Sequence, residues 1–371
     1  MREGLRCNGK TLAGPLRPAS FFTSMNPEPF RRLRSATVIW VGILLLIGCR
    51  TPSREVALQR YEFRSPLMGT LVSITMYAAD YLSATNAAST AFSRIAALER
   101  MMSDYDPDSE LMQVCQQPVG LPTPVSNELF EVLSKALQLA RVTDGAFDPT
   151  AGPYVRLWRR ARRTQTLPST NWLAVAGQSV GWKKLRLDSR NKTVTLAVPG
   201  MQLDLGGLAK GYAADQALQV LKKLGITRAL VAAGGDIAVG DPPPGKRGWR
   251  IGIAAPECGN RAPVKMVLLR NSAVSTSGDT EQFVEINGVR YSHIVNPKTG
   301  IGLTNRIQVS IFGKDAVTTD SFATAVCVLG VKHGLTLVES RQDLAALILR
   351  KTGDKLEVFA SSRFHKIPSV D

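Results

Sequence analysis

The sequence lacks the residue patterns that mark several common enzyme and metal sites. Its 371 residues include only three histidines and five cysteines, with no Cys-x-x-Cys pair and no Cys/His cluster, so we expect no zinc site. No Gly-x-Ser-x-Gly elbow supports Ser/His/Asp hydrolysis. Gly-x-Gly-x-x-Gly and P-loop motifs are also missing, which argues against an ordinary Rossmann or Walker phosphate site.

The N-terminal segment has no apolar run long enough to cross a bilayer. The run from Ala36 to Gly48 has 13 residues, whereas a spanning helix needs about 20. Three arginines precede it, and it ends in Leu-Ile-Gly-Cys at Cys49, which resembles the lipobox of bacterial lipoproteins. We therefore expect residues 1–48 to be a signal peptide, with Met25 as a candidate true start, and Cys49 to be lipidated. The alternative is a short membrane anchor that is never cleaved.

Acidic residues are scarce, since 30 Asp and Glu stand against 46 Lys and Arg and the formal charge is +16. The densest basic patch consists of five arginines in one short segment: Arg156, Arg159, Arg160, Arg162 and Arg163. An exported protein rarely meets nucleic acid, so we expect no nucleic-acid partner. We expect the patch to face anionic lipid head groups or an acidic partner, or to be a solvated helix face.

Hydrophobic periodicity predicts an α+β fold with mixed, largely antiparallel sheets and packed helices. Amphipathic spacing predicts helices over 88–102 and 129–140, the second with Ser126 as N-cap and Gly145 just past its end. The second half is rich in predicted strands, at 228–232, 249–254, 264–269, 283–286, 289–291 and 307–312. Asn287-Gly288 between two of them predicts a hairpin turn. Regular βαβ units are missing, and no linker marks a second domain.

The most informative segment runs from Leu203 to Asp215 and reads Leu-Asp-Leu-Gly-Gly-Leu-Ala-Lys-Gly-Tyr-Ala-Ala-Asp. Two strands are predicted over 195–198 and 202–205, followed by a helix that Gly225 caps. Asp204 and Lys210 would then meet at a helix N-terminus, where outward-pointing amides and the helix dipole favour an anion. We expect a phosphate or a metal to approach this Gly-rich turn. The alternative is a tight turn with both charges solvated.

Two further groups are candidates for chemistry. Asp320 and Thr324 lie four apart on a helix that is predicted to end at Gly330, so both oxygens share one face and suit Mg²⁺ with substrate phosphates as further ligands. The alternative is a solvent-facing Asp320 and a Thr324 bonded to its own helix. His293 follows a predicted strand and precedes an Asn-Pro turn, a good place for proton transfer, although a structural role is the alternative.

Eight motifs together resemble the FAD:protein FMN transferases, the ApbE family. They occur in the family's order, at residues 68–70, 102–111, 145–150, 203–215, 233–237, 273–278, 293–300 and 319–325. The resemblance runs from about Phe63 to the C-terminal strand. It implies an ApbE-like, T-fold-related architecture, and a division into signal peptide (1–48), lipidated tether (49–60) and flavin transferase domain (61–371). Many family members are lipoproteins, which fits Cys49 and implies a lipid-anchored domain on the extracytoplasmic side of a cell-envelope membrane.

The resemblance also implies the residues of the site. It assigns FAD binding to Met68, Tyr105, Ala146, Phe147, Asp148, Asp204, Lys210, His293 and Ile294. It assigns Mg²⁺ to Asp320 and Thr324, with a backbone oxygen at about Gly207. Lys210 would neutralise phosphate charge together with Mg²⁺, His293 would be the base, and Asp204 would position ribityl or adenosine hydroxyls.

The implied reaction is Mg-dependent transfer of the FMN moiety of FAD to a threonine hydroxyl of an acceptor protein, with release of AMP. The expected acceptor is a subunit of a membrane redox complex. The alternatives are an FAD pyrophosphatase, a non-catalytic flavin-binding lipoprotein, and an envelope-interaction lipoprotein that uses the arginine patch. Tyr105, at the position associated with transferase-type members, argues against the first, and the Asp320–Thr324 pair argues against the second.

Two positions depart from the family pattern. Asn296 stands where the family usually has Asp, so His293 loses a neighbouring charge and we expect its pKa near the unperturbed value of about 6.5. Cys115 stands where an Asn often occurs, and it could pair with Cys258 in an oxidising compartment. Cys327 lies among apolar residues and is expected to be a buried small hydrophobe.

Overall fold

The structure, a computed structural model, describes residues 57–254, 263–279, 282–353 and 355–370. The predictions for Met25, Cys49 and Cys258 fall outside these residues. The first strand begins at Gln59, so it includes the last two residues of the tether predicted over 49–60.

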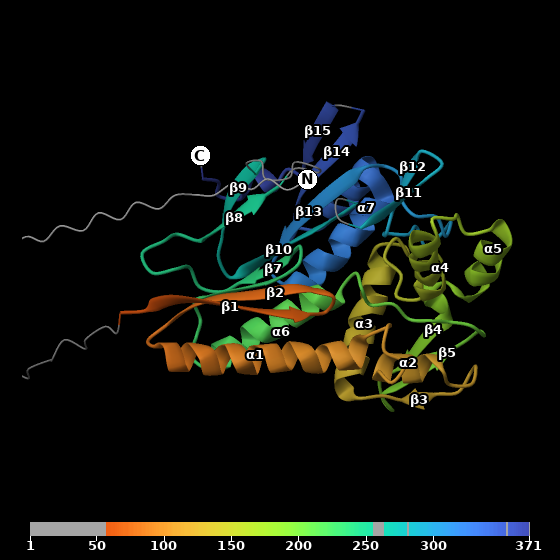
Figure 1. Ribbon diagram of the computed structural model, residues 1–371, viewed down its shortest axis with the longest axis horizontal. Helices are drawn as coiled ribbons and strands as arrows, with labels where there is room; N and C mark the ends of the chain where they lie inside the picture. The colour runs from red at the N-terminus through yellow and green to blue at the C-terminus, as the bar shows by residue number, and fades with distance from the viewer. Residues whose placement is uncertain (1–56, 255–262, 280–281, 354, 371) are drawn as a thin grey trace, which may run out of the picture. The chain divides into compact units, whose positions relative to one another are not determined.

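An eight-stranded antiparallel sheet forms the centre of the described chain (Figure 1). Its strands follow the order β1, β2, β6, β7, β10, β13, β14 and β15, with every neighbouring pair antiparallel. Their bounds are Gln59–Leu67, Thr70–Ala78, Ala229–Ala233, Asp236–Val239, Ser272–Gly278, Ile307–Gly313, Ala345–Thr352 and Lys355–Ala360. The predicted α+β class is confirmed, because tight turns rather than regular βαβ crossovers join β1 to β2, β6 to β7 and β14 to β15.

Three helices cover one face of this sheet, namely α1 (Tyr81–Met102), α6 (Ala209–Lys223) and α7 (Ala316–Glu339) (Figure 1). Helix α6 packs against α1, α7, β6 and β7, while α7 packs against β10 and β13. Side chains that are fully buried between these layers include Ile74, Ile95, Leu221, Val309 and Phe322. The helix predicted over 88–102 is confirmed as the C-terminal part of α1.

Helix α7 is long and apolar enough, by length and composition, to resemble a membrane-spanning helix. Within the fold its apolar residues serve the core, because the helix lies against α6, β10 and β13 and carries the buried Asp320. The predicted helix end at Gly330 is confirmed. The chain leaves helical geometry at this glycine, with a φ of 71° that glycine adopts at little cost, and a second helical segment follows to Glu339.

The opposite face of the sheet is covered by a hairpin of β8 (Trp249–Ile253) and β9 (Lys265–Leu269). Its buried side chains meet those of the sheet in a second core that includes Trp249, Phe312 and Leu347. Strand β13 therefore contributes to both cores, with Val309 on one face and Phe312 on the other. This double burial explains its nearly continuous apolar sequence.

A further group of elements lies beside the main sheet (Figure 1). It comprises α2 (Glu110–Cys115), α3 (Asn127–Val142), α4 (Gly152–Thr164), α5 (Thr170–Ser179), β3 (Thr123–Pro124), β4 (Leu185–Asp188), β5 (Thr193–Leu196), β11 (Phe283–Ile286) and β12 (Val289–Ser292). Short 3₁₀ turns occupy Trp182–Lys184 and Phe364–Lys366. The predicted N-cap Ser126 is confirmed, since its Oγ accepts the Leu129 N–H at 3.1 Å. The predicted Asn287-Gly288 turn is confirmed by φ values of 54° and 74°.

The strand predicted over 202–205 is wrong. These residues form an irregular loop, and the Asp204 N–H donates to the carbonyl of Pro149 at 2.8 Å. Leu203 and Leu205 are both buried, so apolar and polar residues alternate here as they do in a half-buried strand. The partner of the segment is nevertheless another loop. Helix α6 follows as predicted, and Gly225 ends it with a φ of +83°.

The N-terminus of α7 depends on a carboxylate supplied by α6. Asp215 accepts the Ala316 N–H at 2.8 Å and the Val317 N–H at 2.9 Å. We predict that Asp215→Ala lowers the free energy of unfolding by about 2–3 kcal/mol, because two amides of a packed helix end lose their acceptor. Urea unfolding would measure this change. Asp80→Ala, which removes the cap of the exposed start of α1, should cost about 1 kcal/mol or less, and an equal loss in both variants would contradict the prediction.

Candidate active site

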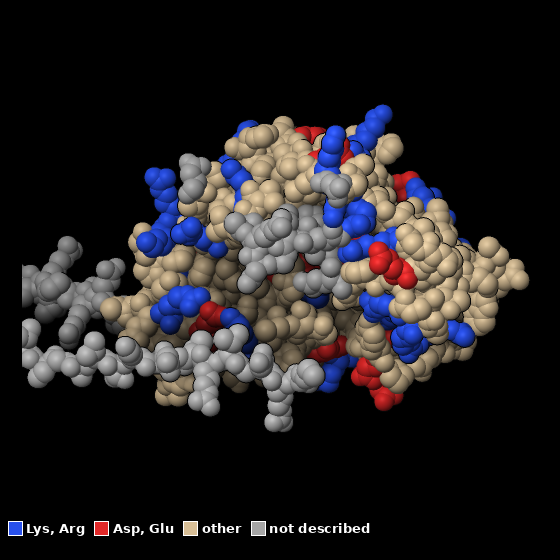
Figure 2. Space-filling model, turned by 45° about the horizontal axis from the view of Figure 1, so that its top comes forward, with Lys and Arg blue, Asp and Glu red and all other residues tan. Residues whose placement is uncertain are grey.

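A cleft of about 960 Å³ lies among α4, the start of α6, α7 and the hairpin β11–β12, within the size range of about 300–1,000 Å³ typical of cofactor sites. It brings together every residue that the sequence predicts for binding or chemistry. These residues are Met68, Tyr105, Ala146, Phe147, Asp148, Asp204, Gly207, Lys210, His293, Ile294, Asp320 and Thr324. Lysine and arginine side chains gather on the face of the molecule shown in Figure 2, with fewer acidic side chains between them.

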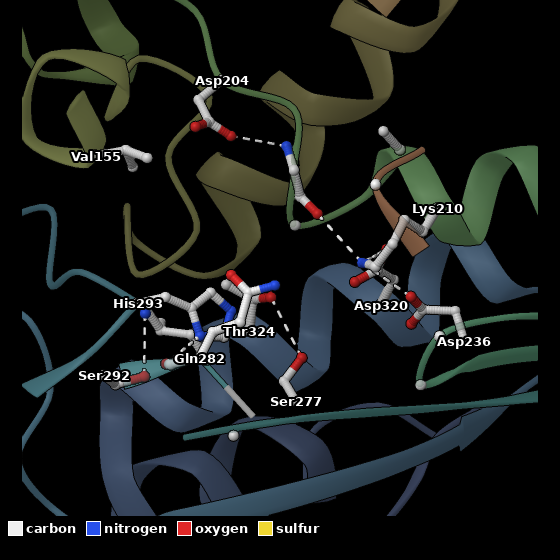
Figure 3. Close-up of a pocket in the computed structure, with 18 of the residues that line it drawn as sticks. Val155, Asp204, Lys210, Asp236, Ser277, Gln282, Ser292, His293, Asp320 and Thr324 are labelled. Atoms are coloured by element: carbon white, nitrogen blue, oxygen red, sulfur yellow. Dashed lines mark hydrogen bonds and ion pairs between the residues drawn. The ribbon is translucent and has the colours of Figure 1, made fainter. Parts of the chain in front are cut away.

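Lys210 stands between two carboxylates from different elements (Figure 3). Its Nζ lies 2.9 Å from Oδ2 of Asp236, at the start of β7, and 3.7 Å from Oδ2 of Asp320, on α7. Burial lowers the pKa of Lys210, but Asp236 and Asp320 more than offset this effect, so the pKa lies above its ordinary value and the side chain is an ammonium. The alternative in which Lys210 is a solvated surface charge is wrong.

Asp320 is almost completely buried, so the alternative of a solvent-facing carboxylate is wrong as well. Burial and the neighbouring Asp236 raise its pKa, while Lys210 and the Gly211 N–H, which donates to Oδ2 at 3.1 Å, act in the opposite direction. Helices α6 and α7 can approach this closely only because Gly211 has no side chain. A Cβ there would collide with the Ala316 carbonyl and lie 2.9 Å from the Asp320 Cβ.

Thr324 lies one helical turn beyond Asp320, beside the Gly-rich turn (Figure 3). Its Oγ1 is 3.5 Å from Oγ of Ser277 on β10, rather than bonded to its own helix. A Cβ on Gly207 would lie 3.1 Å from Oγ1 of Thr324, so this backbone and this hydroxyl are close neighbours. Hard oxygen donors therefore converge here, and the donor set fits Mg²⁺. Among the described residues no group of three or more His, Cys, Asp or Glu could hold a metal, so such an ion would need substrate oxygens as ligands.

His293 follows β12 and retains solvent-exposed surface in the cleft. Its Nδ1 is 3.0 Å from the Gln282 carbonyl, and because a carbonyl can only accept, Nδ1 carries the proton and Nε2 keeps a free lone pair. The expectation of a pKa near 6.5 is wrong. Desolvation and, to a smaller extent, the positive charges of Lys210, Arg162 and Arg159 lower the pKa of His293 to about 4, although the Gln282 hydrogen bond raises it. The imidazole is therefore neutral at physiological pH.

Asp204 is held at both carboxylate oxygens. Oδ1 accepts the Gly206 N–H at 2.8 Å, and Oδ2 lies 3.3 Å from Nη2 of Arg159. Burial and the nearby Asp104 raise the pKa of Asp204, whereas Arg159, the Gly206 amide and Lys210 lower it. Its geometry therefore fixes the turn that precedes α6.

Both carboxylate oxygens of Asp148 accept hydrogen bonds from neighbouring protein groups. Oδ1 accepts from the amide and the hydroxyl of Thr150 at 2.8 and 2.6 Å, and Oδ2 accepts the Trp182 N–H at 2.9 Å. These bonds hold the loop that presents Ala146 and Phe147 to the cleft. Met68 lies in the turn between β1 and β2 with a φ of 54°, where the carboxylate of Glu99 accepts its N–H at 2.8 Å.

Asp236 and Arg159 are two charged residues of the cleft that the sequence did not assign to the site. Asp236 belongs to the Gly-Gly-Asp motif at 234–236, which signalled a special position but no role. Arg159 was one of five arginines expected to face lipid, an acidic partner or solvent, and for this residue the expectation is wrong. It points inward, pairs with Asp104 and Asp204, and stacks over the Tyr105 ring at 4.0 Å.

Comparisons with known proteins agree with this architecture. A model described as the ApbE family matches residues 68–348. The chain is 31% identical over 338 residues to the FAD:protein FMN transferase of Vibrio cholerae, covering 90% of this chain and 98% of the relative. It is 34% identical over 274 residues to the FAD:protein FMN transferase of Haemophilus influenzae, covering 72% and 79%.

Solved structures of this family also resemble the chain over most of its length. The flavin transferase ApbE from Vibrio cholerae superposes with a TM-score of 0.76 at 30% identity, covering 84% of this chain and 99% of that one. The ApbE protein from Thermotoga maritima gives a TM-score of 0.76 at 30% identity, with 83% and 99% covered. The chain belongs to the ApbE family.

The low pKa of His293 predicts the pH dependence of the reaction. Because the folded protein holds the imidazole neutral, the base form should persist down to about pH 4, and kcat/KM for FAD should fall only as the pH drops through that value. A pH–rate profile measures this limb. His293→Ala should slow transfer by about 10²–10⁴ and lose the limb. A limb near pH 6.5, or one that persists in the variant, would contradict the prediction and make Asp204 the next candidate base.

Proposed function

We propose that this enzyme transfers the FMN moiety of FAD to a threonine hydroxyl of an acceptor protein, with Mg²⁺ as cofactor and AMP as the second product. The chain is a flavin transferase of the ApbE family, in line with relatives named FAD:protein FMN transferase. One observation supports the details of this proposal. A single cleft combines an ammonium between two carboxylates, a Gly-rich helix start with adjacent oxygen donors, and a neutral histidine with a free Nε2.

The reaction exchanges one phosphorus–oxygen bond for another. The threonine oxygen attacks the FMN phosphorus, the bond from that phosphorus to the bridging oxygen breaks, and AMP leaves with the bridging oxygen. The hydroxyl proton passes to Nε2 of His293, which the Nδ1–H bond to Gln282 orients as an acceptor. The product is FMN joined to the protein through a phosphoester.

Lys210 would stabilise the charge that develops on the departing AMP phosphate, because its ammonium is fixed by Asp236 and Asp320 before substrate arrives. The start of α6 adds amides and a helix dipole that favour the pyrophosphate. Asp204 holds the Gly206 turn and lines the part of the cleft next to Tyr105, where ribityl or adenosine hydroxyls would bind.

Asp320 and Thr324, with a backbone oxygen at about Gly207, would hold the metal. When bound, Mg²⁺ would neutralise phosphate charge and orient the pyrophosphate. This assignment is supported by the hard oxygen chemistry of the set and by the closeness of Gly207 to Thr324.

The expected result of the central experiment is covalent flavinylation. Purified enzyme, FAD and Mg²⁺ are incubated with candidate subunits of membrane redox complexes, and intact-mass spectrometry should show one added FMN moiety on a threonine, with equimolar AMP. AMP release without any modified acceptor, at the same rate whether or not an acceptor is present, would favour an FAD pyrophosphatase instead.

Two variants on α7 test the metal site in the same assay. Asp320→Ala removes a charged ligand and should abolish most Mg-dependent transfer, whereas Thr324→Ala removes a hydroxyl that water can replace and should cost less. Titration of Mg²⁺ against initial rate measures both effects. Full activity of Asp320→Ala after chelator treatment would rule out this site.

We further propose that the enzyme is a lipoprotein anchored at Cys49, with its domain on the extracytoplasmic side of the cell envelope. The arginine-rich start and the Leu-Ile-Gly-Cys sequence support this proposal. Cys49→Ser should block lipid attachment and leave the precursor uncleaved, as judged by mass and by partition into detergent. Unchanged mass and unchanged membrane association in the variant would refute it.

A further inference from the structure

The arginine-rich segment of α4 is not uniform in the structure. Arg163, in the last turn of the helix, is exposed, whereas Arg159, one turn earlier, has a side chain that is only 24% exposed and lines the cleft. Spacing alone would not separate the two, because residues four apart in an α-helix share a face. The difference arises from the loops that approach α4 near Arg159.

Arg159 makes three contacts that use different parts of its guanidinium. Nη1 donates to Oδ2 of Asp104, Nη2 lies 3.3 Å from Oδ2 of Asp204, and Cζ lies 4.0 Å from the centre of the Tyr105 ring. The two carboxylate side chains are only 13% and 11% exposed. A planar fork that can stack on a ring while donating from two nitrogens is a property of arginine and not of lysine.

The two carboxylates belong to separate loops that both line the cleft. Asp104 and Tyr105 lie between α1 and α2, and Asp204 lies in the loop that leads into α6. Through Asp204 the connection extends further, because its Oδ1 holds the Gly206 N–H and the Gly206 carbonyl lies 3.4 Å from Nζ of Lys210. A continuous series of contacts therefore links Arg159 to Lys210, at the end of the cleft where the pyrophosphate would bind.

Without Arg159, two poorly solvated carboxylates would face each other with no cation between them. Burial and the nearby Asp104 already disfavour the charged form of Asp204, and both raise its pKa. Repulsion would drive the two loops apart and release the Tyr105 ring, while Lys210, Asp320 and His293 would keep their own partners.

We propose that Arg159 is a positioning residue for FAD, which fastens the Tyr105 loop to the Asp204–Gly207 loop at the separation that the bound dinucleotide requires. The inference rests on the proposed function, because it assumes that the cleft binds FAD. It concerns binding geometry rather than the chemical step, since Arg159 forms its hydrogen bonds and ion pairs with Asp104 and Asp204, and its charge is the weakest of the influences named above on the pKa of His293.

The experiment compares Arg159→Ala, Arg159→Lys and Arg163→Ala in the otherwise complete protein. The dissociation constant of FAD alone is measured by flavin fluorescence, and KM for FAD, kcat and Tm are measured with Mg²⁺ and an acceptor. Arg159→Ala should raise the dissociation constant and KM by about 10- to 100-fold, which corresponds to about 1.4–2.8 kcal/mol of binding free energy. Its kcat at saturating FAD should change by less than about threefold, a margin well below the 10²-fold effect of misplaced reacting groups.

The matched variants separate charge, geometry and folding. Arg163→Ala removes a positive charge one turn away and should leave all values near those of the wild type. Arg159→Lys keeps the charge but not the planar guanidinium, so it should recover only part of the affinity. If Arg159→Ala fails to fold, the lysine variant tests the inference instead, through the same rise in the dissociation constant and KM at nearly constant kcat. Asp104→Asn combined with Arg159→Ala should be non-additive in the dissociation constant.

Several outcomes would overturn the inference. One is an unchanged dissociation constant in Arg159→Ala; another is a fall in kcat and Tm at constant KM, which would mean that Arg159 only supports the fold. Full recovery of affinity by Arg159→Lys would show that charge alone matters and would also overturn it. A wild-type protein that binds no FAD would instead refute the proposed function, so the two failures are distinguishable.

Discussion

The ion-paired Lys210 is the interaction on which the site depends. Its ammonium joins the start of α6 to Asp236 of β7 and to Asp320 of α7, so one charge fixes the positions of three elements. Asp236 and Asp320 are both almost fully buried, and loss of one partner from such a group leaves an uncompensated charge, typically at a cost of about 3–5 kcal/mol. The same arrangement presents a cation and backbone amides to a pyrophosphate without reorganisation when substrate binds.

Close backbone approach is the second constraint, and it explains the glycines around Lys210. Gly211 lets α6 contact the first turn of α7, and Gly207 lets the preceding turn approach Thr324. Asp204 then sets that turn through the Gly206 amide, and Arg159 ties Asp204 to the Asp104–Tyr105 loop. Charge pairing and the lack of side chains on these glycines therefore act together to hold the loop that precedes α6 against the Asp104–Tyr105 loop.

Much of the local structure could be predicted from the sequence, because local signals specify it. Ser126 caps α3, Asn287-Gly288 turns the β11–β12 hairpin, and Gly225 ends α6, all within a few residues of the signal. Where the signal was not local, prediction failed. The alternation at 202–205 indicated a strand, but the segment pairs with a loop at Pro149 rather than with a neighbouring strand. The predicted pKa of His293 was also wrong, because desolvation and the nearby cations lower it below the ordinary value that the absence of an Asp at position 296 would leave.

The sequence by itself determined the fold class, the helix and hairpin ends, and which motifs belong to one family, because periodicity, capping and turn chemistry operate over short spans of chain. The tertiary structure decided that Arg159, among five similar arginines, turns inward and that Asp236 pairs with Lys210 alongside Asp320. It also decided that the carboxylate of Asp148 accepts hydrogen bonds from Thr150 and Trp182. Apart from the Asp148–Thr150 bonds, those outcomes depend on contacts between residues more than 20 positions apart in the chain. Burial then fixes the charge and hydrogen-bond partners of each group, and burial is a property of the packed molecule.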